Sequence, residues 1–242
     1  MTVILTKRIT NGVRPNCEHN WERKKDGTLR FGQRLKFKWA DVWGSLGTPL
    51  SDPTEEKSWR RLLHRATDAR NRHRGADHRC RLQCGCQDES MLHMVTCRNS
   101  KPFWAACIAF CTNVLHEPAD MSDTPKTIIF NMAGNNKLLS MPTCAFLRHA
   151  VRWWYASMTK VHRENMIFSW RTCFHTTLLK FREAVVRNCI GIRRHFIHRV
   201  HTQLTGVVSE AERGKYACVA KIEPNGTYTI SPALEATIQA YT

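Results

Sequence analysis

The stretch CRLQCGCQDESMLHMVTC, residues 80–97, places four cysteines and one histidine within eighteen positions. A tetrahedral metal site needs four such donors, and short loops between paired ligands let the backbone wrap an ion without a large core. The spacing Cys80-x3-Cys84-x8-His93-x3-Cys97 supplies two ligand pairs. The first pair fits a tight turn, and the second fits one face of a helical turn. The stretch therefore predicts a closed, structural site for one zinc ion.

Two alternatives remain open for this stretch. Cys86 competes with Cys84, because either sulfur of a Cys-Gly-Cys sequence can reach an ion while both together would be strained. We expect Cys84 to be the ligand. The other alternative is a set of buried or free cysteines beside an incidental histidine. Ser90, preceded by two acidic residues, is the expected cap of a short helix that ends at Cys97.

The whole chain predicts a mainly α fold with a small zinc knuckle and a short β-hairpin at each end. Alternating apolar residues over 29–39 favour strands near the N-terminus, and Pro53 is expected to open a basic helix. The expected divisions are a β-prone N-terminal segment at 1–50, a basic helix plus zinc knuckle at 51–115, a linker at 116–142, a basic helical region at 143–205 and a C-terminal β-hairpin at 206–242.

Local sequence patterns predict the secondary structure of three of these segments. The helix from Pro53 is expected to reach Arg72, with Trp59 and Leu62 on its buried side. Residues 143–204 contain no proline and one glycine, which predicts two or three helices. Asn225-Gly226 is typical of a hairpin turn.

Cys107 and Cys111 lie at helical spacing among apolar residues, so we expect core positions there rather than a second metal half-site.

The charge of the chain points to a polyanionic partner. Thirty-seven Lys and Arg face 20 Asp and Glu, giving a net charge of +17, and residues 143–204 hold eleven basic and two acidic side chains. An ordinary solvated helix mixes the two signs. His195, His198 and His201 are expected on a basic, phosphate-facing surface rather than on a metal. The arginines expected to contact nucleic acid are Arg60, Arg61, Arg65, Arg70, Arg72, Arg74, Arg193, Arg194 and Arg199.

Composition and missing motifs exclude several classes of protein. No apolar run approaches the roughly 20 residues of a membrane span. Eleven cysteines, an odd number in a long chain, argue against a secreted disulfide scaffold. We expect a reducing intracellular compartment, with nucleus and organelle both open. The sequence has no paired aspartates, Gly-rich phosphate loop, Gly-x-Ser-x-Gly or His-Glu-x-x-His, so we expect no enzymatic activity.

A family resemblance covers residues 58–104, about a fifth of the chain. This stretch resembles the zinc-binding segment found downstream of the reverse transcriptase domain in non-LTR retroelements. The matching positions are Trp59-Arg60-Arg61-Leu62-Leu63-His64, Cys80, Cys84, Glu89-Ser90, His93, Cys97 and Trp104. Three residues between the first two cysteines, and the additional Cys86, depart from the commoner pattern. The resemblance implies nucleic-acid binding beside a polymerase, while the aspartate pair of a polymerase is missing here.

The leading hypothesis is a non-catalytic, zinc-stabilised nucleic-acid-binding protein related to such a retroelement region. RNA is favoured over DNA, because neither a helix-turn-helix nor a finger with twelve residues between its ligand pairs is visible. The alternative is an architectural subunit of a ribonucleoprotein particle such as an organellar ribosome, with other proteins of the particle as partners. A third hypothesis is a module in which zinc orders a surface for an acidic protein.

Overall fold

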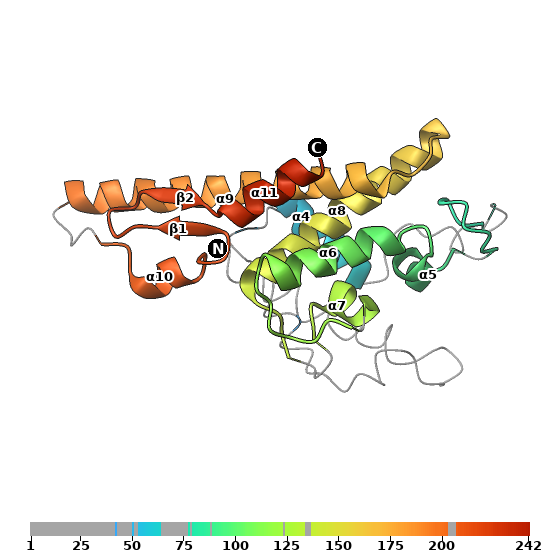
Figure 1. Ribbon diagram of the computed structural model, residues 1–242, viewed down its shortest axis with the longest axis horizontal. Coiled ribbons are helices and arrows are strands. Elements are labelled where there is room, and N and C mark those ends of the chain that lie inside the picture. The colour runs from blue at the N-terminus through green and yellow to red at the C-terminus, as the bar shows by residue number, and fades with distance from the viewer. Residues whose placement is uncertain are drawn as a thin grey trace, which may run out of the picture.

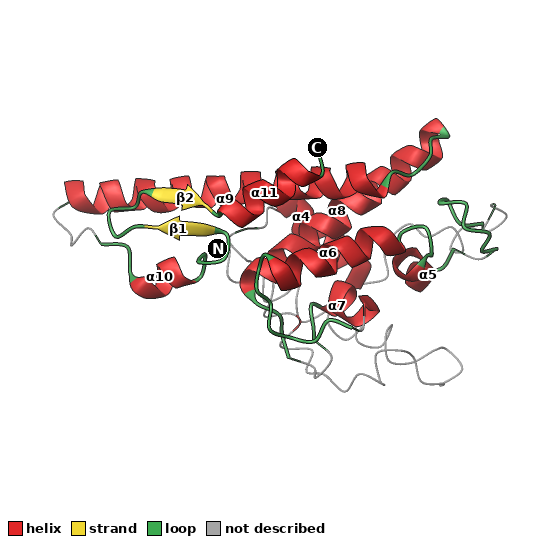
Figure 2. Ribbon diagram, viewed as in Figure 1, coloured by secondary structure: helices red, strands yellow, loops and turns green. Residues whose placement is uncertain are grey.

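The described part of the chain is mainly helical, with a small antiparallel sheet near the C-terminus (Figure 2). The computed structural model describes residues 42, 50, 53–63, 77, 79–87, 89–122, 124–133, 137–202 and 207–242. The elements are α4 (Pro53–Leu63), α5 (Met91–Thr96), α6 (Lys101–Asn113), α7 (Thr124–Phe130), α8 (Met141–Glu164), α9 (Trp170–His201), α10 (Glu210–Gly214), β1 (Ala220–Ile222), β2 (Tyr228–Ile230) and α11 (Pro232–Ala240). The mainly α class is confirmed; the expected N-terminal strands lie outside the described residues.

Two long helices, α8 and α9, form the frame of the molecule (Figure 1). The predicted break in the 143–205 region falls at Asn165, whose φ of 50° is left-handed and ends α8. Ser169 then starts α9 by accepting a hydrogen bond from the Thr172 amide at 3.3 Å. The chain turns back here, and α9 packs against α8. No helix in the described ranges combines the length and apolarity that a membrane crossing needs.

The core lies where α6 packs on α8 and α9. Phe110 and Phe146 have ring centroids 4.5 Å apart, and Phe181 meets Phe146 edge-on at 5.4 Å. Cys107 and Cys111 are fully buried among these rings, as predicted for core positions. Burial raises the pKa of both thiols well above the usual range, which keeps them neutral.

Helix α4 is fixed on α8 by a buried aromatic-cation contact. Trp59 is fully buried, and the Arg148 guanidinium lies 4.7 Å from the centre of its ring. Next to it, His149 donates from Nε2 to the Leu50 carbonyl at 3.0 Å, while its Nδ1 lies 3.6 Å from Glu55. Arg148, one of the eleven basic residues counted in the 143–204 region, is thus a core residue, and burial lowers its pKa.

The segment predicted as a linker, 116–142, contains a buried helix. In α7, Lys126 and the run 127–130 are all buried, and the helix packs on both α4 and α5. The β-branched residues of this run have a low intrinsic helix propensity. Packing against two neighbouring helices stabilises α7 despite this low propensity. This segment therefore ties the basic helix to the cysteine-rich stretch.

The C-terminal hairpin is present as predicted, with two helices that the sequence did not indicate. Lys221 pairs with Thr229, and Gly226 provides the left-handed turn residue, with φ of 75°. A Cβ at Gly226 would lie 3.2 Å from the Phe196 Cβ, so the turn sits close against α9. Helix α11 follows and packs on α9. Helix α10 precedes the hairpin.

Candidate metal centre

The structure brings together the four residues that spacing predicted as metal ligands. One ligand atom from each of Cys80, Cys84, His93 and Cys97 lies within 4.8 Å of the other three. The Sγ atoms of Cys80 and Cys97 are 3.7 Å apart, and Cys84 Sγ lies 3.3 Å from His93 Nε2. A disulfide bond would need a distance of about 2.05 Å between the two sulfur atoms. Metal–sulfur bonds of about 2.3 Å in a tetrahedron place two sulfurs about 3.8 Å apart, so the donors fit a four-coordinate metal ion.

A tight backbone turn presents the first two sulfurs. The Cys80 amide donates to the Cys86 carbonyl at 3.0 Å, and the Gln83 amide donates to the Cys80 carbonyl at 2.9 Å. Gln83 and Gly85 both have left-handed φ values, of 53° and 87°. Glycine adopts this conformation at no steric cost. The turn points Cys84 into the cluster, whereas Cys86 is not one of the four clustered residues.

Helix α5 presents the imidazole, and its N-terminus differs from the predicted one. Ser90 caps α5 as expected, accepting a hydrogen bond from the His93 amide at 3.1 Å. Glu89, expected to help the cap, is instead fully buried. Its carboxylate accepts from the Arg81 amide at 2.7 Å and lies 3.1 Å from Arg81 Nε. This buried ion pair ties the cysteine turn to the start of the helix.

Backbone donors hold two of the sulfurs in place. The amide two residues after each cysteine donates to its sulfur, Leu82 to Cys80 and Asn99 to Cys97. The Asn99 side chain in turn donates from Nδ2 to the Leu82 carbonyl at 2.7 Å, which joins the two turns. Such hydrogen bonds favour the thiolate form, which is the form that binds metal. These backbone donors would remain available to both sulfurs once a metal ion had displaced their protons.

Without a metal, two of the cysteines share a proton. Cys80 donates its S–H toward Cys97, and this hydrogen bond, together with burial, raises the pKa of Cys80 to about 12. The same hydrogen bond lowers the pKa of Cys97. Within the pair, Cys97 therefore loses its proton first and Cys80 keeps its proton to higher pH. A metal ion would have to displace the Cys80 proton.

The predicted nucleic-acid-contacting arginines whose side chains the structure describes do not gather at the cluster. Arg61, Arg193 and Arg194 are exposed, and half-buried Arg60 lies 3.4 Å from Glu56. Figure 1 places α4 near the centre and the C-terminal end of α9 far from α5. Of the remaining arginines, Arg199 lies on α9 but its side chain is not described, and Arg65, Arg70, Arg72 and Arg74 lie outside the described residues.

Basic side chains that sequence reasoning missed lie beside the cysteine turn. Two hollows, of about 470 and 460 Å³, share Arg81 and Gln83 as lining residues. Exposed Arg98 lines the first hollow, and His162, from the end of α8, lines the second. Arg98 follows a ligand directly, a position that could have identified it. No sequence pattern indicated His162, because only the tertiary fold brings α8 to this turn.

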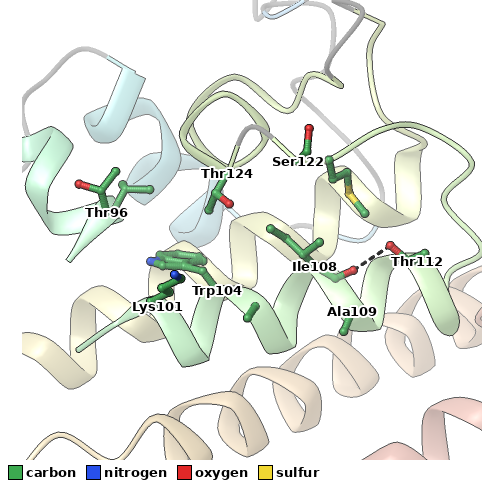
Figure 3. A pocket seen from close by; sticks show the side chains of 11 residues that line it. Thr96, Lys101, Trp104, Ile108, Ala109, Thr112, Ser122 and Thr124 are labelled. Atoms are coloured by element: carbon green, nitrogen blue, oxygen red, sulfur yellow. Dashed lines mark hydrogen bonds between the residues drawn. The ribbon is translucent and has the colours of Figure 1, made fainter. Parts of the chain in front are cut away.

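A third hollow lies beside α5 and is mostly apolar, with Val95 and Thr96 of that helix among its lining residues. It has a volume of about 620 Å³ and lies between α6 and the 121–124 segment (Figure 3). Trp104 and Ile108 line it from α6, and Lys101 is the one charged side chain among its described lining residues. Aliphatic and hydroxyl groups make up the rest. This chemistry suits an apolar group and provides no acid–base pair.

No family model, curated protein or solved structure matches the chain. The assignment of the site therefore rests on its geometry and donor chemistry.

Replacing any one ligand should release the metal. We expect Cys80→Ser, Cys84→Ser, Cys97→Ser and His93→Gln each to weaken metal affinity by at least about 100-fold, since even substitutions of residues that only orient a ligand cost 10- to 100-fold. Bound metal would be measured by mass spectrometry after dialysis against a chelator. Cys86→Ser is the matched control and should retain the metal. Loss of metal in Cys86→Ser, with retention in Cys84→Ser, would contradict the ligand set.

Metal binding should release protons, because Cys80 keeps its proton in the metal-free chain. Calorimetric titration with metal at pH 7 in two buffers of different ionisation heat counts the protons released. The affinity should rise with pH, by about tenfold per unit for each proton displaced. A binding heat that is independent of the buffer, with a pH-independent affinity, would contradict coordination by these thiols.

Proposed function

We propose that this chain is a non-catalytic, zinc-stabilised nucleic-acid-binding protein. The observation that carries the proposal is the cluster of three thiols and one imidazole, bordered by basic side chains. Zinc suits this donor set, because thiolates and imidazoles select it over the harder Mg²⁺ and Ca²⁺ ions. All four positions are filled by protein groups, so the ion is structural and no open position is left for a substrate. The ion locks the cysteine turn onto α5.

The charge distribution supports a polyanion as the partner. Arg79 and Arg98 are exposed and lie next to Cys80 and Cys97 in sequence, and Arg79 also pairs with Asp77 at 2.9 Å. At the other end of the molecule, the sequence between Glu183 and Glu210 contains no acidic residue. It holds arginines and histidines instead, and those of α9 whose side chains are described are exposed. Two basic regions on one rigid frame suit an extended phosphate backbone.

RNA is the favoured nucleic acid. The described helices do not form the helix-turn-helix of a major-groove reader, and the ligand spacing is not that of a DNA-binding finger. Exposed Gln83 and Gln87 on the cysteine turn offer amides, and half-buried Trp153, 5.7 Å from the Arg152 guanidinium, offers an aromatic face. Amides and aromatic faces are the groups that contact unpaired bases. The sequence resemblance to the segment downstream of a retroelement reverse transcriptase supports the same class of partner.

The second candidate, an architectural subunit of a ribonucleoprotein particle, is favoured by the connection between α8 and α9. Met166 and Ile167 at this tip are 48% and 94% exposed. Large aliphatic side chains at such exposure are typical of a surface that a partner covers. In that case the tip would contact protein while the arginines contact RNA. A chain that is stable only within a particle would favour this candidate over the first.

Nucleic-acid affinity should depend steeply on salt. If six to ten phosphates are contacted, affinity for a single-stranded RNA should fall by about 300-fold to 16,000-fold between 50 and 200 mM salt, at 0.7 per phosphate contact. The variant Arg61→Ala/Arg194→Ala should reduce the slope of log affinity against log salt by about 1.4, at 0.7 per phosphate contact. Fluorescence anisotropy of a labelled oligonucleotide measures both quantities.

The control for general loss of charge is Lys221→Ala, whose ammonium lies 2.8 Å from Glu223 on the hairpin. This variant should leave the slope unchanged. Binding that does not respond to salt would contradict the proposal, as would an unchanged slope in Arg61→Ala/Arg194→Ala.

A further inference from the structure

The outer face of α9 carries a row of exposed aliphatic side chains. Leu179, Ile190 and Ile197 are 38%, 37% and 44% exposed, and Val200 is 52% exposed. Half-buried Val186 lies between them. The helix runs along one edge of the molecule (Figure 1), and no described element covers this row. Aliphatic side chains repeated along one exposed helix face, with Glu183 and Arg193 between them, are typical of a surface that a partner helix covers.

The spacing of the row is that of a helix-pairing seam. Steps of four and three residues alternate through Leu179, Glu183, Val186, Ile190, Arg193 and Ile197. This alternation places side chains at the a and d positions of a heptad, which face a partner helix. Phe181, Val185 and Ile192 point the other way and are buried in the core. The seam is about 27 Å long, at 1.5 Å rise per residue.

We propose that the occupant of this seam is the same helix of a second copy of the chain, packed antiparallel in a two-fold symmetric dimer. A two-fold axis at the level of residue 188 places Leu179 opposite Ile197 of the partner subunit. It also places Val186 opposite Ile190 of the partner subunit. In an antiparallel pair, the a positions of one helix face the d positions of the other. Each pairing produced by this axis joins an a position to a d position. A self-complementary surface of this kind is the mark of an isologous dimer.

Charge complementarity selects this arrangement. The same axis places Glu183 opposite Arg193 of the partner subunit, so the two charged positions of the seam pair twice, once on each side of the axis. A parallel pair would instead place Glu183 against its own copy and Arg193 against its own copy. Like charges in such layers disfavour the wrong register. The two charged positions of the seam thus favour antiparallel pairing.

One flank of the seam is basic and sets how the dimer responds to salt. Lys180, Arg187 and Arg194 lie along it, and Lys180 also pairs with Glu183 of its own helix at 3.0 Å. The antiparallel pair brings Arg187 beside Arg187 of the partner subunit and Lys180 beside Arg194 of the partner subunit. Salt screens this repulsion, so self-association should strengthen as salt rises. Nucleic-acid affinity should change in the opposite direction. The inference does not depend on the proposed function.

Sedimentation of the metal-loaded, nuclease-treated full chain tests the dimer. The unmodified chain should associate reversibly, and more strongly in about 0.5 M salt than in 0.1 M. Glu183→Arg and Arg193→Glu should each weaken self-association at least tenfold, because each creates two like-charge contacts across the axis. The double variant Glu183→Arg/Arg193→Glu should restore it.

Two controls separate the seam from general effects of charge. Glu164→Arg removes a comparable exposed carboxylate, one that lies 3.8 Å from Lys160 of its own helix, and should leave association unchanged. Arg171→Glu, on the same helix as the seam but outside it, should do the same. Thermal unfolding confirms that each variant folds. A chain that stays monomeric at about 100 μM, a concentration that populates interfaces of micromolar affinity, would overturn the proposal. Association that needs nucleic acid, or that the double variant fails to restore, would also overturn it.

Discussion

The account depends on one constraint: four donor atoms, drawn from a turn and from the two ends of a short helix, meet around a space the size of a single ion. The sulfurs of Cys80 and Cys97 are too far apart for a disulfide and close enough to share a proton. That separation is the edge of a metal–thiolate tetrahedron. The buried Arg81–Glu89 pair and the Asn99–Leu82 hydrogen bond hold the two halves of the site together. A metal ion would replace the hydrogen bond between Cys80 and Cys97 by coordination and would compensate the burial of their sulfurs.

The cluster is connected to the neighbouring helices and not to every part of the described structure. Through α5 and α7 it connects to α4, whose Trp59 is held by the buried Arg148 of α8. The C-terminal end of α9 lies far from α5 and is fixed by the hairpin, where Gly226 packs against Phe196. The structure thus separates an end that carries the cysteine–histidine cluster from a basic helical end. A polyanion that touches both ends must span the frame formed by α8 and α9.

The sequence was informative where structure follows from local spacing. The pairs Cys80/Cys84 and His93/Cys97 repeat at ligand spacing, and Asn225-Gly226 has strong turn chemistry; both features are present. The sequence was uninformative where burial in the tertiary structure decides whether a residue is exposed or which secondary structure it adopts. Arg148 has the same local pattern as an exposed helical arginine, yet Trp59 covers it. Likewise, the run that forms α7 has little helical periodicity, and His162 reaches the cysteine turn only because α8 ends there.

The central claim is that three sulfurs and one imidazole of this chain hold one zinc ion. X-ray absorption at the zinc edge of the purified, metal-loaded protein tests it most directly. The account predicts a four-coordinate first shell with three sulfurs at about 2.3 Å and one nitrogen at about 2.0 Å. A shell dominated by oxygen, or one with four sulfurs and no imidazole, would contradict it.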